Sequence, residues 1–468
     1  MPEFNPPSPE LNPYTNPGGL VGEVMAYTLA SSPRPVPEIA LAGAIGFIAG
    51  IVGRNFNVRG TGLNQYVLLL APTGRGKEAM ARARSALMSS VMKSVPAAAT
   101  FIGPARFASL QALVGHLENN RVFMSIIGEF SAELNRLCGP KASENGRELE
   151  QGILDLWGKS AASDAYEGIV RADRTKNVSR IEAPAFSFIG ESVPERIDER
   201  LTSDIVMSGM LPRVTTIRYE GPRVPENEGF SSVAPPPELV ERIAGLCSDI
   251  LSMQNPFRGR HVEFTPEAEA LRKSFDKFCD IQINKKSQLG SFSELWNRAG
   301  LKSAKLAALI AVGVNPYMPT ITVQQMQWAI NIEYRGIQDF LAKVESGEVG
   351  EVTEDVRLSR VAKACAEYIM QREPWLFPKG YRVDHDLHDR EIITFSYLNN
   401  KLGNTKPFRK DGYKEPSKLI REALDVLVAR GDLELWRKGS RPIQGENDFQ
   451  LRVDGWLISN PRAFIPDQ

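Results

Sequence analysis

Residues 64–78 read Asn64-Gln-Tyr-Val-Leu-Leu-Leu-Ala71-Pro-Thr-Gly74-Arg-Gly76-Lys77-Glu78. Within them an apolar run, residues 66–70, is followed by a loop that holds two glycines and a lysine. The run from 66 to 70 is typical of a strand buried on both faces, and the residues after Glu78 favour a helix. In such a strand–loop–helix unit, backbone N–H groups surround phosphates while the lysine reaches their outer oxygens. Residues 71–78, here called the glycine loop, therefore predict a nucleotide site. Its expected binding residues are Thr73, Gly74, Arg75, Gly76, Lys77 and Glu78.

Two positions of the glycine loop depart from the usual pattern. Ala71 replaces the first glycine, which is a mild change, and Glu78 replaces the Ser or Thr whose hydroxyl normally binds Mg²⁺. A glutamate can bind a hard cation through oxygen, yet its charge lies near the phosphates that the loop should attract. We expect ATP with Mg²⁺ as the ligand and Glu78 as a metal ligand. The alternative is a plain strand-to-helix turn.

The composition is that of an ordinary globular protein with room for two or three domains. The chain has 468 residues, of which 42% are hydrophobic and 24% are charged. Lys and Arg together number 56, as do Asp and Glu, so net charge gives no preference for a polyanionic partner. Any DNA-binding surface must therefore come from local segregation of charge.

Cysteine spacing and hydropathy indicate the compartment. The four cysteines are widely spaced without a CxxC pair, which argues against a disulfide framework or a zinc ribbon and favours free thiols in a reducing cytoplasm. The longest apolar run, residues 39–52, is shorter than the roughly 20 residues that span a bilayer. It contains three glycines and predicts a buried helix. We expect a cytoplasmic protein with no membrane partner and no signal peptide.

Two further apolar runs end in polar residues that suit nucleotide chemistry. Residues 121–127 end at Gly128-Glu129, and residues 185–189 end at Gly190-Glu191-Ser192. In nucleotide hydrolases the strand beside the phosphate loop ends in carboxylates that order metal-bound water and activate the attacking water. We expect Glu129 to be the catalytic base or a metal ligand; alternatively it caps the next helix. Ser192, or Glu191, could contact the terminal phosphate or the attacking water.

Two later arginines are candidates for phosphate contact. Arg213 stands at the start of another expected strand, where ring-forming ATPases often place an arginine that reaches a neighbour's nucleotide. A surface arginine paired with a local carboxylate is the alternative. Arg298 interrupts the apolar face of a helical segment, residues 295–310, and is expected to sense phosphate from a helical lid. The expected helices of this part of the chain span 79–95, 109–119, 150–158, 194–201, 237–254, 266–283, 294–314 and 322–344.

Apolar and polar side chains alternate in residues 166–184 on either side of a polar tip. This pattern predicts a hairpin with four cations, which are Arg171, Arg174, Lys176 and Arg180. A basic hairpin suits contact with nucleic acid, although a solvated edge hairpin would also be basic.

A last domain is expected from residue 347, with helices at 352–372, 393–402 and 415–430 and a hairpin at 433–442 and 449–453. Three helices and a two-stranded wing predict a winged helix-turn-helix. Its third helix and wing are basic, so DNA contact is expected through Lys418, Arg421, Arg437 and Lys438. Protein contact is the alternative.

The order of these pieces resembles the YfjI-like family of prophage and plasmid P-loop proteins. The resemblance rests on residues 39–54, 65–77, 126–134, 186–194 and 209–213, covers roughly residues 20–345, and is most specific in Gly-Met-Leu-Pro-Arg213. It implies an ATPase that works on mobile-element DNA as a ring. Family members usually have Ser or Thr at position 78 and Asp at position 128, so both magnesium-ordering groups are altered together.

The sequence thus predicts an α/β P-loop NTPase core of the RecA or AAA+ type with a helical N-terminal segment and lid, followed by a winged helix. The expected divisions are a disordered arm (1–18), a helical segment (19–62), the NTPase core (63–225), a lid (226–346) and a winged-helix domain (347–468). The expected function is a helicase-like, DNA-associated ATPase of phage or prophage replication that assembles as a homo-oligomer, taken as a hexamer, on single-stranded or forked DNA. The alternative is a weakened P-loop scaffold that acts as a DNA-binding initiator, loader or regulator.

Overall fold

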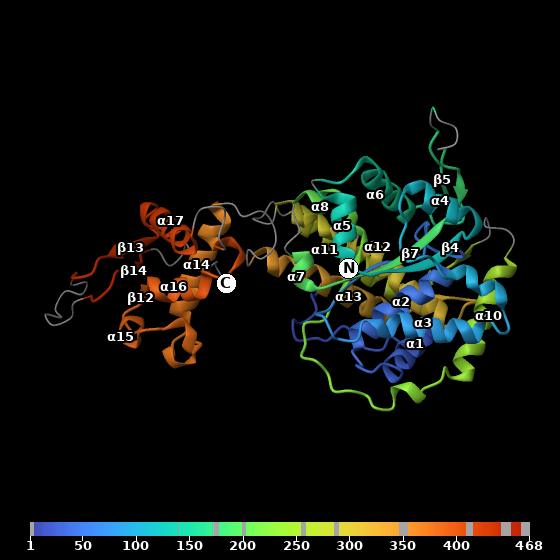
Figure 1. Ribbon diagram of the computed structural model, residues 1–468, viewed down its shortest axis with the longest axis horizontal. Coiled ribbons are helices and arrows are strands. Elements are labelled where there is room, and N and C mark those ends of the chain that lie inside the picture. The colour runs from blue at the N-terminus through green and yellow to red at the C-terminus, as the bar shows by residue number, and fades with distance from the viewer. Residues whose placement is uncertain are drawn as a thin grey trace. The chain divides into compact units, whose positions relative to one another are not determined.

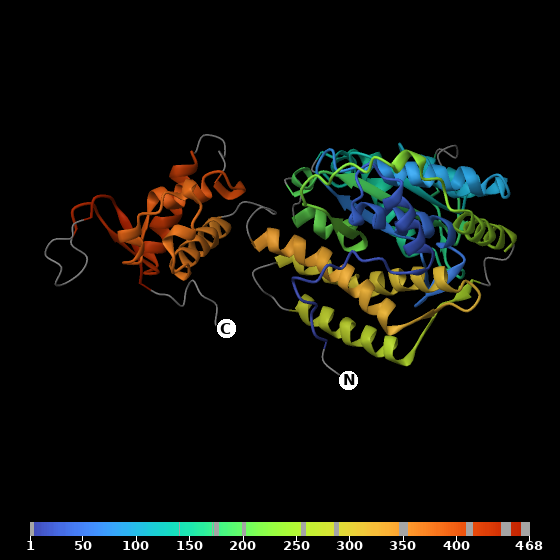
Figure 2. The ribbon, with the colours of Figure 1, turned by 90° about the horizontal axis from the view of Figure 1, so that it is seen from below.

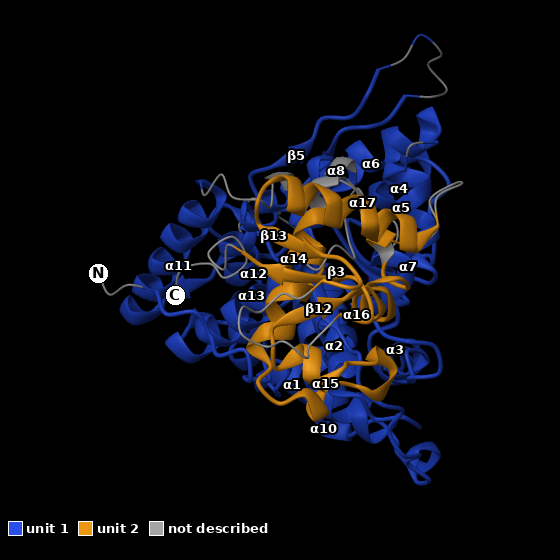
Figure 3. Cartoon of the chain, turned by 90° about the vertical axis from the view of Figure 1, so that its left-hand side faces the viewer, with its two compact units in different colours: residues 1–341 blue, residues 342–468 orange. Residues whose placement is uncertain are grey.

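The chain forms two compact units in a computed structural model, residues 1–341 and residues 342–468 (Figure 3). The structure describes residues 4–139, 141–170, 172, 177–198, 203–253, 259–284, 290–345, 354–408, 415–440 and 451–459. The described part is a mixed α/β protein in which no helix is long and apolar enough to cross a membrane.

A four-stranded parallel sheet lies at the centre of the first unit (Figure 1). Its strands are β3 (Tyr66–Leu70), β4 (Val122–Ile127), β7 (Ala185–Ser192) and β8 (Thr215–Arg218), in the order β4-β7-β3-β8. The predicted strand at 66–70 is confirmed, and those at 121–127 and 185–189 are confirmed with small shifts of their ends. Because the strands are parallel, their carboxyl ends meet at one edge, the carboxyl edge, and their amino ends meet at the opposite amino edge.

Helix α2 (Pro37–Val52) lies directly on the sheet because its glycines let the backbone come close. A Cβ on Gly46 would lie 2.6 Å from Ile189 of β7, and one on Gly50 would lie 2.4 Å from Met124 of β4. All but the first two residues of α2 are buried. Residues 19–62 are therefore part of the same compact unit as the sheet, and the prediction of a separate helical segment is corrected.

Other helices cover the opposite face and the β8 side of the sheet. Gly190 follows Ile189 and so faces the other way, and a Cβ there would meet the ring of Phe130, the first residue of α5 (Phe130–Cys138). Helix α13 (Val323–Glu345) reaches β8, where Gly336 lies close to the carbonyl of Thr216. The predicted lid helices thus belong to this unit, with β8 in contact with one of them.

Residues 4–18 are not the disordered arm that the sequence predicts. Phe4 is 8% exposed, and its ring lies 5.0 Å from the rings of both Phe275 and Phe278. The guanidinium of Arg335 donates hydrogen bonds to the carbonyls of residues 9 and 11, at 2.6 and 2.7 Å. Figure 2 shows this segment in dark blue beside the long helices of the unit. Phe4 orders this Pro-rich stretch because the rest of the first unit supplies the surface on which its ring packs.

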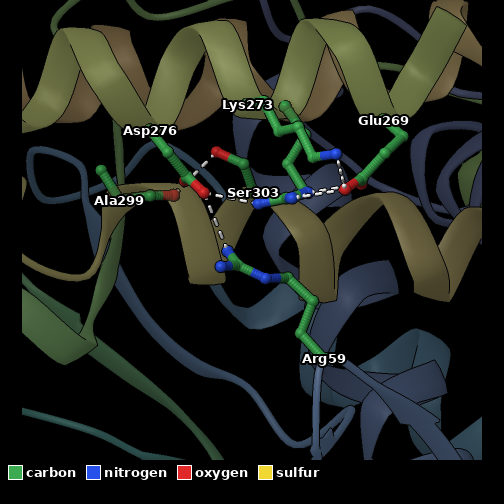
Figure 4. Close-up of polar contacts among 7 residues, drawn as sticks. Arg59, Glu269, Lys273, Asp276, Ala299 and Ser303 are labelled. Atoms are coloured by element: carbon green, nitrogen blue, oxygen red, sulfur yellow. Dashed lines mark hydrogen bonds and ion pairs between the residues drawn. The ribbon is translucent and has the colours of Figure 1, made fainter.

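Asp276 of α11 (Pro266–Asn284) joins three elements of the helical layer (Figure 4). It pairs with Arg59 at 3.2 Å and with Arg272 one turn earlier on its own helix. Arg59 and Gly60 have φ of 49° and 74° and form the tight turn between β1 (Phe56–Val58) and β2 (Thr61–Gly62). A Cβ on Gly300 would lie 1.8 Å from the Asp276 carboxylate, so glycine is required where α12 (Ala299–Val314) begins.

The second unit contains three longer helices and a three-stranded antiparallel sheet. The helices are α14 (Glu354–Met370), α16 (Phe395–Leu402) and α17 (Pro416–Ala429), and the strands are β12 (Ile392–Thr394), β13 (Leu433–Trp436) and β14 (Gly455–Ile458), in the order β12-β14-β13. The predicted partner strand at 449–453 is corrected to β14. Residues 449–450 lie outside the described part, whereas Trp456 is buried in the core and pairs with Leu435.

The remaining elements complete the two units. Helices are α1 (Gly19–Ala30), α3 (Glu78–Val91), α4 (Leu110–Asn119), α6 (Glu144–Trp157), α7 (Pro194–Asp198), α8 (Ser203–Met207), α9 (Met210–Arg213), α10 (Pro237–Ser252) and α15 (His385–His388). Short strands are β1 (Phe56–Val58), β2 (Thr61–Gly62), β5 (Ala165–Tyr166), β6 (Ile181–Glu182), β9 (Arg260–His261), β10 (Glu263–Phe264) and β11 (Thr320–Ile321).

Candidate functional site

The glycine loop joins the carboxyl end of β3 to α3 and lies at the carboxyl edge. Gly74 and Gly76 have φ of 74° and 88°, a region that favours glycine. None of the backbone N–H groups of residues 73–78 donates a hydrogen bond to another described residue. No side chain caps the N-terminus of α3. These amides and the helix end together provide donors suited to an anion.

The turn between α1 and α2 fixes the glycine loop from outside. A Cβ on Gly76 would lie 2.9 Å from both Cβ and the carbonyl oxygen of Arg34. Arg34 in turn donates to the Val224 carbonyl at 2.8 Å and pairs with Glu226 at 2.9 Å. Arg75 donates to the Gly221 carbonyl at 3.3 Å. The loop is therefore held between two segments that are far apart in sequence.

Lys77 closes the loop with its ammonium group over the ends of two strands. Its Nζ donates to the carbonyl of Ala71 at 2.9 Å and to that of Ser192 at 3.4 Å. Burial lowers the pKa of Lys77, and the carboxylates of Glu191 and Glu129 oppose that shift. Ser192 contributes its carbonyl to this arrangement, whereas its hydroxyl lies near the carbonyl of the next residue.

The strands beside β3 are β7 and β8, and not the strand that ends at Glu129 as the sequence interpretation assumes. Glu191 of β7 pairs in register with Leu69 and is half-buried. Burial raises the pKa of Glu191 to about 7, although Lys77 lowers it. Glu191 thus changes protonation near neutral pH beside the lysine of the glycine loop. In the described part of the chain it has no ion pair within 4.0 Å.

Glu129 lies beyond the next strand along, two residues after the end of β4. Its carboxylate is 71% exposed and pairs with Arg196 at 2.6 Å. Its backbone has φ of 49°, and its side chain makes no capping hydrogen bond to α5. Glu129 therefore occupies the N-cap position of α5, as the helix-cap alternative expects, but it contributes its carbonyl and not its carboxylate to the helix end. Glu129 is a solvent-facing carboxylate within electrostatic range of Lys77.

The two carboxylates predicted as metal ligands, Glu78 and Glu129, both influence the charge of Lys77. Among the residues that the structure describes, no three His, Cys, Asp or Glu side chains are grouped to hold a metal by themselves. Mg²⁺ bound with a nucleotide needs only one or two protein carboxylates, since phosphates and water supply the other ligands. These two residues fit that limited role.

Arg213 and Arg298 lie at the amino edge, away from the glycine loop. Arg213 stands two residues before Thr215, which pairs with Val67 near the start of β3. Its Nη1 donates to the Gly209 carbonyl at 2.9 Å. Burial lowers the pKa of Arg213, and the positive charge of Arg298 lowers it further. The structure therefore brings the two arginines near each other, whereas Lys77 lies past the other end of β3.

The predicted DNA-binding residues fall into three groups. Arg171, Arg174 and Lys176 lie outside the described residues. Arg180 lies on the predicted hairpin, now seen as β5 and β6, and is paired with Glu167 at 3.1 Å and Glu182 at 3.0 Å. Four cations of the second unit are exposed, namely Lys418, Arg421, Arg437 and Lys438. The Arg421 guanidinium lies 4.1 Å from the centre of the Phe395 ring.

Sequence reasoning did not identify Arg34, because its role depends on a contact with the glycine loop from outside the motif. Glu191 was expected only as an alternative to Ser192, because the apolar run before Glu191 does not reveal which strand pairs with β3. The polar end of an apolar run was the available signal, and it applied equally to Glu129. A search against models of protein families gives no match, and no curated protein matches the chain.

Proposed function

We propose that the first unit binds a nucleoside triphosphate, ATP, at the glycine loop and hydrolyses it. The observation that carries this proposal is the set of backbone N–H groups of residues 73–78, which donate to no other described residue, beside the ammonium group of Lys77. A P-loop NTPase uses these two features together to bind phosphates. The position of the loop, at the carboxyl end of a central parallel strand and the start of a helix, supports the same assignment.

The residues around the loop have distinct roles in this proposal. Lys77 exchanges its backbone carbonyl partners for phosphate oxygens, because a charged acceptor binds an ammonium group more strongly than a neutral one. Glu191 or Glu129 accepts a proton from the attacking water, and Ser192 orders the strand end beside it. Glu78 and Glu129 would hold Mg²⁺, which supplies charge neutralisation at the phosphates when bound.

The proposed assembly is a homo-oligomeric ring, with Arg213 of one copy directed at the nucleotide of the next. The place of Arg213 at the amino edge supports this, since it is remote from the glycine loop of its own chain. DNA contact is proposed for the exposed cations of the second unit, which has the helix and strand content of a winged helix. Together these parts form a helicase-like ATPase of phage or prophage replication, the class that the family resemblance implies.

A DNA-binding scaffold with weakened hydrolysis is the second candidate. The pairing of Glu129 with Arg196 favours it, because the carboxylate is already engaged by the guanidinium and would have to leave it to reach an attacking water. Glycine at position 128 favours it too, since an aspartate normally stands there in the family that the chain resembles. A Cβ on Gly128 would meet nothing within 4 Å, so the structure has room for an aspartate.

The test is ATP turnover with and without single-stranded DNA, measured for the natural chain and for the double variant Glu78→Ser, Gly128→Asp. DNA-stimulated turnover in the natural chain supports the ATPase. No turnover in the natural chain together with a large gain in the double variant supports the scaffold. Absence of both turnover and nucleotide binding in every variant would refute the assignment of the glycine loop.

A further inference from the structure

We propose that the segment between α14 and α15, residues 370–383, binds single-stranded DNA by stacking a base on the ring of Trp375. This segment, here called the Trp375 platform, is distinct from α17 and the end of β13, where the cations already proposed to contact DNA lie. The choice of DNA over RNA rests on that proposed contact. The platform itself needs no nucleotide at the glycine loop, so either site can fail without the other.

The Trp375 platform gathers large apolar side chains that face solvent. Met370, Trp375 and Leu376 are 62%, 68% and 58% exposed. In the described part of the second unit, the other large apolar side chain exposed to a similar degree is Val453, at 47%. Single exposed apolar side chains are common, whereas a group of them in one short segment marks a binding surface.

Aromatic packing fixes the backbone of the platform from beneath. The ring of Phe377 lies 5.7 Å from the ring of Tyr368 and 5.6 Å from that of Tyr397. The amide of Leu376 donates to the carbonyl three residues earlier at 3.0 Å and closes a turn around Trp375. The exposed ring of Trp375 is therefore carried by an ordered backbone, which lowers the entropy cost of binding a ligand.

Cations lie on both sides of Trp375 along the platform. Arg372 stands three residues before it, and Lys379 and Arg382 stand four and seven residues after it. All three side chains are exposed. In the described part of the chain, none of the three forms an ion pair within 4.0 Å. These charges are available to an anionic ligand that reaches the ring.

The carboxylates near the platform do not neutralise it. Residues 370–383 contain three cations and one carboxylate, Glu373, and so carry a net charge of +2. Asp384 follows them and is engaged at the start of α15, where its side chain accepts a hydrogen bond from a backbone amide. Asp386 lies within α15, and Glu367 pairs with a lysine of α16. The net positive charge favours a polyanion.

These features fit a single strand better than a duplex or a protein. A single strand exposes the faces of its bases, which stack on aromatic rings, and its phosphates bind cations beside the ring. A duplex hides the faces of its bases between neighbouring pairs. Lysine is depleted at protein–protein interfaces, so Lys379 beside the apolar group disfavours a protein partner. The expected ligand is a strand of any sequence, since every base has a face for stacking.

The first measurement is the affinity of the full chain for a fluorescently labelled oligothymidylate of about 15 nucleotides, followed by anisotropy. Trp375→Ala should bind about fivefold or more weakly, because one stacked base is lost. Trp375→Tyr keeps a ring and should lose less. Tyr317→Ala, which removes a ring that is 73% exposed in the first unit, is the matched control and should leave the affinity unchanged. The Tm of Trp375→Ala should equal that of the natural chain, because the ring is exposed.

The second measurement is the salt dependence of that affinity. Each cation that contacts a phosphate of a single strand adds about 0.7 to the steepness of log K against log salt. Arg372→Ala and Lys379→Ala should each make the dependence shallower by about that amount. Trp375→Ala should weaken binding without changing the slope. Glu373→Gln removes the opposing charge of the segment and should strengthen binding.

Five outcomes would overturn the inference. The natural chain could fail to bind the oligothymidylate, or Trp375→Ala could bind it with natural affinity. An equal loss of affinity for a duplex would show that the ring supports the fold rather than a base. A lower Tm in Trp375→Ala would mean that protein covers the ring. Self-association that Trp375→Ala abolishes, with the affinity for DNA unchanged, would assign the platform to a second copy of this chain.

A control with RNA tests the choice of nucleic acid. Tighter binding of an oligouridylate than of the oligothymidylate would overturn the assignment to DNA, and equal or weaker binding supports it. Binding of ATP at the glycine loop is measured separately, so a failure of the Trp375 platform leaves the proposed nucleotide site standing.

Discussion

Replacing each glycine of the glycine loop by alanine should have unequal effects on stability. Gly74 and Gly76 have similar positive φ, so both alanines are strained by roughly 1–2 kcal/mol. Both substitutions also remove the same freedom from the unfolded chain, which offsets about 0.4–1 kcal/mol in each case. The difference between the two variants therefore isolates contacts made in the folded state.

The contacts differ sharply. A Cβ on Gly74 meets nothing within 4 Å, whereas a Cβ on Gly76 lies 2.9 Å from the carbonyl oxygen of Arg34. Arg34 is held by its own hydrogen bonds to residues 224 and 226, so it cannot move freely. Overpacking of this kind costs about 1–3 kcal/mol. Gly76→Ala should thus be less stable than Gly74→Ala by that amount.

Thermal unfolding of the full chain measures the difference. A unit of 341 residues has an unfolding entropy near 0.7 kcal/mol/K, so 1 kcal/mol shifts Tm by about 1.4 °C. The Tm of Gly76→Ala should lie roughly 1–4 °C below that of Gly74→Ala. Equal Tm values, or a lower value for Gly74→Ala, would refute the placement of the loop against Arg34.

Two further predictions concern the core of the first unit. Burial holds the pKa of Lys305 well below its ordinary value of 10.5, so the unfolded chain binds the proton more tightly and stability should rise with pH up to that value. Lys305→Met should remove this rise, which can reach about 1.4 kcal/mol per pH unit, and an unchanged slope in denaturant titrations at several pH values would contradict the assignment. Gly50→Ala places a methyl group 2.4 Å from Met124 and should lower Tm, whereas Gly115→Ala, in a helix with open space, should leave it unchanged or raise it. A Gly50→Ala variant as stable as Gly115→Ala would mean that α2 does not lie directly on the sheet.

The elements of the first unit could largely be predicted from sequence because their signals are local. Residues 66–70 are apolar without interruption and form a strand with both faces covered. The run at 39–52 reads as a buried helix, and its three glycines are explained by contact with the sheet and α3. The local pattern predicts these elements but not the elements against which they pack. Residues 19–62 were therefore expected to form a division separate from the sheet.

The arrangement of the site depended on information that no local pattern contains. The order β4-β7-β3-β8 puts Glu191 on a strand that pairs with β3, whereas Glu129 follows an equally apolar run one strand further away. Arg298 sits on a helical face that is consistent with a lid, and only the packing of α12 on Trp157 puts it at the amino edge. Composition predicted disorder for residues 1–18, yet Phe4 packs against the aromatic rings of Phe275 and Phe278.

Equilibrium binding of a fluorescent ATP analogue to the natural chain and to Lys77→Ala tests the nucleotide site most directly. Among the described residues the ammonium group of Lys77 donates two hydrogen bonds, both to backbone carbonyls, so its loss should leave Tm nearly unchanged. We expect saturable binding by the natural chain and a loss of affinity of about tenfold or more in Lys77→Ala, the effect of one charge-assisted contact. Equal affinity in the two proteins, or no binding by the natural chain, would contradict it.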